Sequence, residues 1–311
     1  MTPPQGETIG EWVSPDIPFP GSSYALDQSS SEAKHQGGGV APPGAAVDRG
    51  GAVGAASSAI EVKSLRALTA PGYAAGFSLM ATGDIGSVEA TTSGLAGSIM
   101  AGGAIGSVTS RGDVVATMTA GGSIGSVETF AGALKGAVIK ASGDIGAITI
   151  GALADQAAIE SSAVTAGGSI GIVKATAIRH LAITQSQFLA GDRIDEVSAT
   201  SLGVMILPMG WMPAAIGETS FTAGSIGTIA ANNEMNVGLG LMNVRLEART
   251  GAIDSIETKA PQGGLKGGWI VAPIGVGALH GTATSWGIPA VAATSHSVHS
   301  ERKSACSRSR P

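Results

Sequence analysis

Four charged residues lie within one short segment of the chain, Asp192, Arg193, Asp195 and Glu196. Paired carboxylates can act as general acid and base in glycoside cleavage, and a neighbouring guanidinium can hold an acidic sugar. In this interpretation Asp192 or Asp195 is the acid or base, and Arg193 binds the substrate. The alternative is a solvated turn whose opposite charges pair locally, which is worth less than about 1 kcal/mol.

Aspartates at glycine-containing turns indicate a second kind of chemistry, because calcium prefers carboxylate and carbonyl oxygens. Calcium-binding repeats need an aspartate in every copy, whereas an isolated aspartate in a turn usually bonds to its own backbone. We therefore predict no cofactor, and calcium is the alternative. One recurring turn position holds, in order, Asp84, Ala104, Ser123, Asp144, Ser169, Arg193, Ser225 and Ala252.

Large apolar side chains gather in the segment from residue 202 to residue 217. Methionine adapts its shape to a partner, and exposed apolar patches often mark interaction surfaces. We interpret the segment either as a loop that contacts a partner or as a loop that folds back over the rest of the chain. The side chains concerned are Met205, Met209, Trp211 and Met212.

Composition and charge exclude several classes of function. The net charge is −5 and basic residues cluster only in the C-terminal tail, so we predict no nucleic-acid binding. The longest uncharged stretch, residues 197–217, contains two prolines, so we predict no membrane span. The hydrolase pattern G-x-S-x-G occurs at 121–125 and 167–171, but both copies are turns of a repeat, so we predict no nucleophile there.

The elements that position these residues are defined by a phrase repeated eight times between Leu79 and Thr258. The clearest copies are LMATGDIGSVEA, IMAGGAIGSVTS, MTAGGSIGSVET and IKASGDIGAITI. Copies lie 19 to 32 residues apart, and repeats of that length are typical of stacked units. Isoleucine occupies one column, and valine or isoleucine follows three residues later. The two columns are Ile85, Ile105, Ile124, Ile145, Ile170, Ile194, Ile226 and Ile253, and Val88, Val108, Val127, Ile148, Val173, Val197, Ile229 and Ile256.

Each copy alternates apolar and polar residues on either side of a glycine-containing corner, as two short β-strands do. Such a unit, about every 24 residues, predicts one turn, or rung, of a parallel β-solenoid in which like residues stack. The predicted fold is an all-β parallel solenoid of about nine rungs with irregular N- and C-terminal flanks. In the segment VKSLRA, Val62 and Leu65 are assigned to the isoleucine and valine columns.

Composition divides the chain into three parts. Residues 1–59 hold seven of the fourteen prolines and are predicted to be an irregular Pro/Gly/Ser-rich leader without a secretory signal. Residues 60–280 are predicted to form the solenoid repeat domain, in which GGWIVAPIGVGALHG is a terminal rung or a cap. Residues 281–311 are polar and are predicted to be a disordered tail.

The copies GDIGSV and GGSIGSV and their period resemble right-handed parallel β-helix proteins. They are most similar to the Gly-rich repeat arrays of large bacterial surface and adhesin-type proteins. The resemblance covers about residues 60–260 and implies a right-handed solenoid. The β-helix group also contains polysaccharide-cleaving enzymes, but no catalytic residue carries over, because the shared residues belong to turns and stacked columns.

The sequence favours a non-enzymatic structural or adhesive module of a bacterial surface or secreted protein, located extracellularly or on the cell surface. Its partner would be a glycan or a protein, bound by a solenoid face or by the 202–217 loop. The alternative is a polysaccharide-active lyase or hydrolase that acts on an acidic glycan through the segment 192–196. An enzyme needs polar side chains from several rungs, and only one rung supplies charges. Whether the chain belongs to a longer array stays open.

Overall fold

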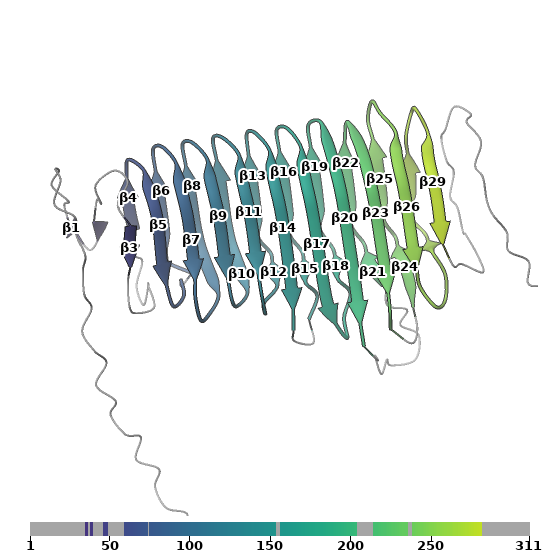
Figure 1. Ribbon diagram of the computed structural model, residues 1–311, viewed down its shortest axis with the longest axis horizontal. Coiled ribbons are helices and arrows are strands. Elements are labelled where there is room, and N and C mark those ends of the chain that lie inside the picture. The colour runs from purple at the N-terminus through teal and green to yellow at the C-terminus, as the bar shows by residue number, and fades with distance from the viewer. Residues whose placement is uncertain are drawn as a thin grey trace, which may run out of the picture.

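Successive repeats stack as parallel strands, one coil beside the next, along the long axis of the molecule (Figure 1). The structure is a computed structural model that describes residues 59–73, 75–153, 156–203, 214–235 and 238–281, together with three short strands before them. The described residues contain no helix, so none that is long and apolar enough to cross a membrane. The predicted all-β parallel solenoid of about nine rungs is confirmed.

The second half of each repeat lies in an eleven-stranded sheet whose described pairings are all parallel. Isoleucine is the most frequent residue in these strands, and β-branched side chains suit the pleated, half-buried surface of a sheet. The strands are β3 (Ala46–Asp48), β5 (Leu65–Ala70), β7 (Ile85–Ala90), β9 (Ile105–Ser110), β11 (Ile124–Thr129), β14 (Ile145–Ala152), β17 (Ile170–Ile178), β20 (Arg193–Leu202), β23 (Ser225–Asn233), β26 (Ile253–Lys259) and β29 (Val276–Gly281).

The first half of each repeat lies in a sixteen-stranded sheet. Its main strands are β4 (Ala59–Val62), β6 (Ser78–Ala81), β8 (Leu95–Ala101), β10 (Val114–Ala120), β13 (Val138–Ala141), β16 (Ala163–Ala166), β19 (Gln187–Ala190), β22 (Ser220–Ala223), β25 (Arg245–Ala248) and β28 (Trp269–Val271). Six further short strands, of two to four residues, precede the later ones: β12 (Leu134–Lys135), β15 (Ile159–Glu160), β18 (Ile183–Thr184), β21 (Ala214–Gly217), β24 (Leu239–Met242) and β27 (Leu265–Lys266).

The short strands are a feature that the two-strand repeat did not predict. β10 is one continuous strand, but it pairs with both β12 and β13, because the next coil bends between Lys135 and Val138. Every later coil described repeats this bend. Coils from β12 onward therefore have three strands and an additional corner.

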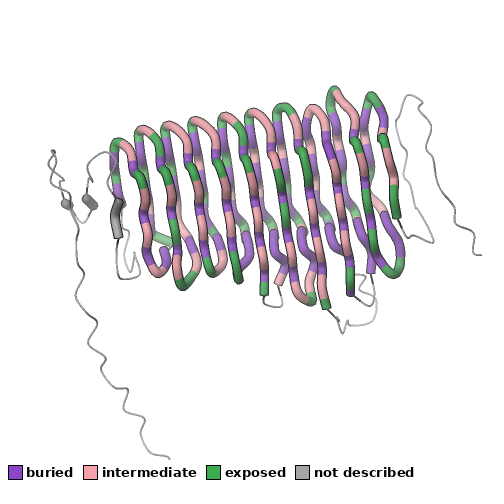
Figure 2. The backbone as a smooth tube through the Cα atoms, viewed as in Figure 1, coloured by how far each residue is buried: buried purple, intermediate pink, exposed green. Residues whose placement is uncertain are grey.

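The core includes the two predicted columns, a column from the main strands of the opposite sheet, and inward residues of the short strands such as Leu134, Ile159 and Ile183. All sixteen predicted column residues are buried. In neighbouring strands, each isoleucine of the first column pairs with the next isoleucine of that column, and each valine or isoleucine of the second column pairs with its counterpart. Figure 2 shows buried and exposed positions alternating along the coils. The opposing column includes Phe188 and Phe221, whose rings stack with centroids 4.9 Å apart. Burying each large side chain contributes about 1.5–3 kcal/mol.

The offset of three residues between the two columns comes from a departure from strict alternation. In β14, Ile145 and Ile148 are buried, and both Gly146 and Ala147 between them face outward. A regular strand would place inward residues two apart. The same two outward positions recur in β7, β9, β11 and β26.

The first coil corrects one sequence assignment. Leu65 pairs with Ile85 and Leu68 pairs with Val88, so these two leucines hold the isoleucine and valine columns. Val62 instead pairs with Ala81, in the other sheet. Val62 and Leu65 are three residues apart, and so are Leu65 and Leu68. The assignment of Val62 and Leu65 to the two columns was wrong because Val62 ends the strand before the corner.

The segment GGWIVAPIGVGALHG forms a rung. It contains β28 and β29, in which Val276 pairs with Ile253 and Leu279 pairs with Ile256. At the other end, β1 (His35–Gln36) and β2 (Gly38–Gly39) pair antiparallel, and β3 pairs parallel with β5. The remaining residues of the predicted leader and the predicted tail from residue 282 onward lie outside the described residues.

Candidate functional site

Arg193 is held by two carboxylates from different coils. Its Nε lies 2.8 Å from Asp195 Oδ1 in the same strand, and its Nη2 lies 2.6 Å from Asp254 Oδ2, two strands away on β26. The strand between them carries Gly227, where a Cβ would lie 2.9 Å from Arg193 Nη2. The missing side chain at Gly227 therefore opens the path by which Arg193 reaches Asp254.

The charge of Arg193 is already balanced at this position. The hydrogen bond that Arg193 donates to Asp254 raises the pKa of Arg193, burial lowers it by a smaller amount, and the remaining attractions of Asp254 and Asp195 raise it further. Among the described residues, the side chains of Asp192 and Glu196 have no hydrogen-bond or ion-pair partner. The structure thus joins Arg193 to Asp195 but not to Asp192 or Glu196. A catalytic role of this segment stays the alternative hypothesis.

The turn aspartates connect neighbouring rungs. Asp84 Oδ1 accepts a hydrogen bond from the backbone N–H of Ala104 at 2.7 Å, and Asp144 Oδ1 accepts one from Ser169 at 2.7 Å. In both cases the carboxylate accepts its hydrogen bond from the next coil, and not from the backbone of its own turn as the sequence suggested. The described residues include no group of three or more His, Cys, Asp or Glu side chains placed to hold a metal ion.

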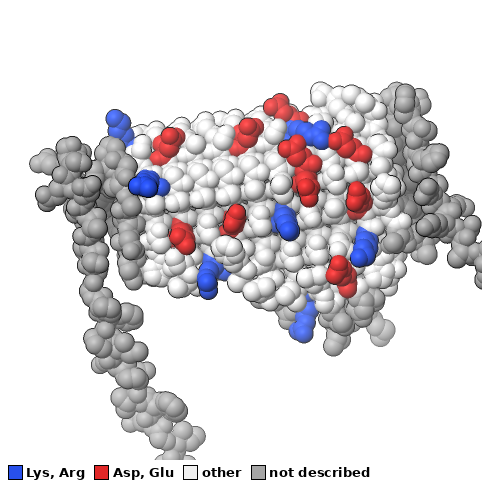
Figure 3. Space-filling view, viewed as in Figure 1, with Lys and Arg blue, Asp and Glu red and all other residues white. Residues whose placement is uncertain are grey.

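The sequence predicted that a partner is bound by the 202–217 loop or by a face of the solenoid. Met205, Met209, Trp211 and Met212 lie outside the described residues, so their role as a contact loop stays a prediction. Figure 3 shows Lys and Arg interspersed with Asp and Glu over one face of the solenoid, without a large area of a single sign. This mixed distribution of charges does not indicate that the face attracts a strongly charged partner.

A shallow groove runs along the additional corner of the later coils. One wall consists of residues just after the short strands, all with left-handed backbone conformation and exposed side chains. Their φ angles lie between 48° and 54°, an uncommon conformation for residues other than glycine. This outer row is Ser161, Gln185, Glu218 and Asn243.

The floor of the groove is formed where the next residue of each coil turns inward. Ser162, Ser186 and Thr219 are buried, and their hydroxyl oxygens lie 3.2–3.5 Å from the backbone nitrogens of the preceding rungs. Each hydroxyl also donates to a carbonyl of its own coil, for example Ser186 Oγ to Thr184 O at 2.7 Å. Most buried polar groups in proteins are hydrogen-bonded in this way.

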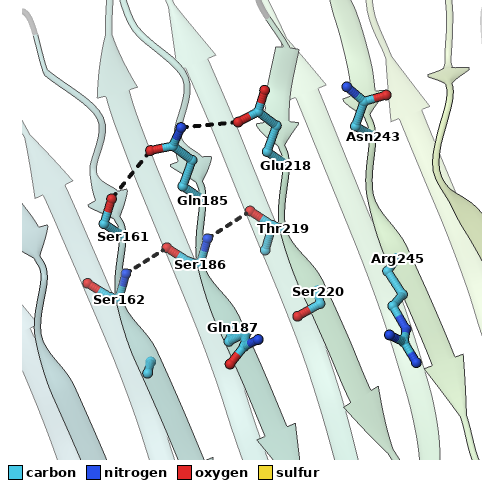
Figure 4. Close-up of a pocket in the computed structure, with 11 residues that line it drawn as sticks. Ser161, Ser162, Gln185, Ser186, Gln187, Glu218, Thr219, Ser220, Asn243 and Arg245 are labelled. Carbon is cyan, nitrogen blue, oxygen red and sulfur yellow. Dashed lines mark hydrogen bonds between the residues drawn. The ribbon is translucent and has the colours of Figure 1, made fainter.

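The second wall is formed by the residue after the floor, where the chain faces outward again. Ala163, Gln187, Ser220 and Arg245 pair in this order across β16, β19, β22 and β25. The outer row, the floor and this inner row line an open hollow of about 540 Å³. We call this feature the corner groove (Figure 4).

The corner groove is lined by hydrogen-bonding groups in an ordered row. Ser161 Oγ donates to Gln185 Oε1 at 3.4 Å, and Gln185 Nε2 donates to Glu218 Oε2 at 3.1 Å (Figure 4). Arg245 donates to Glu247, and its guanidinium lies 4.0 Å from the ring centroid of Trp269. Such a surface can hold a hydroxyl-rich ligand by hydrogen bonds.

Sequence reasoning missed the corner groove, although a signal was present. Each outer-row residue lies five positions before the alanine that ends the next strand of its coil. These alanines are Ala166, Ala190, Ala223 and Ala248. The same offset gives Gly136 and Gly267, which also have positive φ. The column mixes residue types, so it does not stand out as a repeat.

Comparisons with protein-family models, with curated proteins and with solved structures gave no match.

Proposed function

We propose that this chain is a non-enzymatic structural or adhesive module of a bacterial surface or secreted protein. The observation that carries the proposal is the continuity of the stack. The isoleucine column extends in register from Leu65 to Val276 through every strand of the eleven-stranded sheet from β5 to β29. In a rod of this kind, outward side chains recur at the regular distance between coils. Such a surface suits a protein that acts as a spacer or as an attachment surface.

The polar groups outside the corner groove support the same proposal. Arg193 is bonded to Asp195 and Asp254, and Asp84 and Asp144 bond to backbone groups of the next rung. These side chains join coils to each other. Acid/base catalysis instead requires carboxylates directed at a shared substrate position, and the segment 192–196 uses one of its three carboxylates to hold its own arginine.

Protease treatment of intact producing cells tests the location. Peptides from residues 60–280 should be released from intact cells or found in the medium, and a cytoplasmic marker protein should stay intact. Release of these peptides only after lysis would refute the surface proposal. Incubation of the purified chain with polysaccharides should yield no new reducing ends, and their formation would favour the enzymatic alternative.

A further inference from the structure

We propose that the corner groove binds a neutral, hydroxyl-rich polysaccharide that lies lengthwise across the rungs of Ser161, Gln185, Glu218 and Asn243. The inference rests on the proposed adhesive function and names the ligand class and the surface that such a function needs. It differs from the 192–196 segment, which lies on β20 and in the turn before it, outside the groove lining.

The first support is the free hydrogen-bonding capacity of the groove. Sugar hydroxyls both donate and accept, so they match amide, carboxylate and hydroxyl side chains. Gln185 and Glu218 orient each other through one bond and keep one N–H and one carboxylate oxygen for a ligand. Among the described residues, the side chains of Asn243, Gln187 and Ser220 have no hydrogen-bond partner.

The second support is the charge of the lining, which favours a neutral ligand. Glu218 is the negative group of the groove, and an acidic sugar would be repelled there. The positive group is Arg245, which is already bonded to Glu247 and lies over Trp269. The lining therefore offers no unpaired cation for a carboxylate or sulfate.

The third support is shape. Gly136 and Gly267 occupy the outer-row position in the coils just before Ser161 and just after Asn243. The outer row of side chains therefore ends at a glycine on both sides, so no outer-row side chain projects across the axis there. Neighbouring strands repeat about every 4.8 Å, which presents hydrogen-bonding groups at a regular interval. Trp269, 41% exposed, follows Arg245 in the inner row, and the Arg245 guanidinium covers the ring at 4.0 Å from its centroid.

The fourth support is local backbone strain. A non-glycine residue with left-handed backbone conformation is destabilised relative to glycine, which adopts that conformation freely. Glycine already serves at this corner at positions 136 and 267, yet four successive rungs carry Ser161, Gln185, Glu218 and Asn243. Folding of the corner therefore does not require these side chains, which is expected if they bind a ligand.

Substitution by glycine provides the test, because it removes the side chain and relieves the strain together. The double variant Gln185→Gly/Asn243→Gly is compared with Arg179→Gly, a control at a different corner where φ is 61°. Binding of the full chain to a soluble β-glucan, a galactomannan and a xylan is measured by affinity electrophoresis and calorimetry. Polygalacturonate and alginate are the acidic comparators, and a protein-coated surface is the polypeptide comparator.

The wild type and Arg179→Gly should bind at least one neutral polysaccharide alike. The double variant should bind about tenfold or more weakly, with a thermal transition no lower than that of the wild type. Oligosaccharides that span four rungs should bind more tightly than a disaccharide. Equal binding by the double variant, preference for the acidic polymers, groove-dependent binding to the protein-coated surface, or no neutral ligand in the panel would each overturn the inference. The location test is independent, so a surface protein without glycan binding would refute the groove ligand alone.

Discussion

Replacement of Gly168 by alanine should destabilise the solenoid, although glycine-to-alanine changes often stabilise a protein. Gly168 lies one rung after Asp144, and a Cβ at this position would lie 2.1 Å from Asp144 Oδ1. The same oxygen accepts the backbone N–H of Ser169 at 2.7 Å. An alanine must displace the carboxylate, and the inter-rung hydrogen bond is then lost.

The magnitude follows from two opposing terms. Loss of the hydrogen bond costs about 1.5 kcal/mol, and reduced freedom of the unfolded chain returns about 0.4–1 kcal/mol. Gly168→Ala should therefore lower the free energy of unfolding by about 1 kcal/mol in the wild type. In an Asp144→Ala background the bond is already absent, because the next atom near the added Cβ lies 3.6 Å away at Gly143. There the same change should stabilise the protein by about 0.5 kcal/mol.

A double-mutant cycle measures this coupling. Urea denaturation of the wild type, both single variants and the double variant should give an interaction energy of about 1.5 kcal/mol. Gly122→Ala is the matched control, because the preceding rung has Ala104 and the nearest atom to the added Cβ is 3.3 Å away. If Gly168→Ala has the same sign and size in both backgrounds, Asp144 does not bond to the next rung as described.

Three further changes test other parts of the structure. Ile145→Asp places a charge between Ile124 and Ile170 in the buried column and should cost several kcal/mol. The surface control Thr149→Asp on the same strand should change the thermal transition little, and an unmoved transition for Ile145→Asp would contradict the stack. Ser186→Ala removes the oxygen that faces Ser162 N and should cost about 1–3 kcal/mol, whereas denaturation equal to that of wild type would mean that the floor hydroxyls are not needed. Arg193→Ala should cost less than about 1 kcal/mol, and less still in high salt, because its ion pairs are exposed; a large, salt-independent loss in thermal stability would contradict surface pairing.

The repeated columns were predictable because each coil must bury an apolar side chain at the same position as its neighbours. Ile145 and Ile170 pair across neighbouring coils, so the apolar pattern needed for burial is copied in the sequence at each rung. The same logic failed at Val62 and Leu65, since an offset of three residues occurs in two registers there and the pattern alone does not choose between them.

The charged segment was predictable in part. Pairing of Arg193 with Asp195 follows from their spacing, but the bond to Asp254 joins residues 61 positions apart. It depends on three strands being stacked in register and on Gly227 leaving the path open. The role of Asp144 likewise depends on the coil that follows it, because its hydrogen-bond donor belongs to the next copy of the repeat.

The amino-acid sequence by itself determined the parallel stack, its two apolar columns and the glycine-containing corners, because each depends on residue types that recur at a constant offset. Only the tertiary structure decided where the coils gain a third strand and how Ser161, Gln185, Glu218 and Asn243 form one row. These four residues share a backbone conformation and a place in the stack rather than a side-chain type. Since φ is set by the bend of each coil, the row exists only once the coils are stacked.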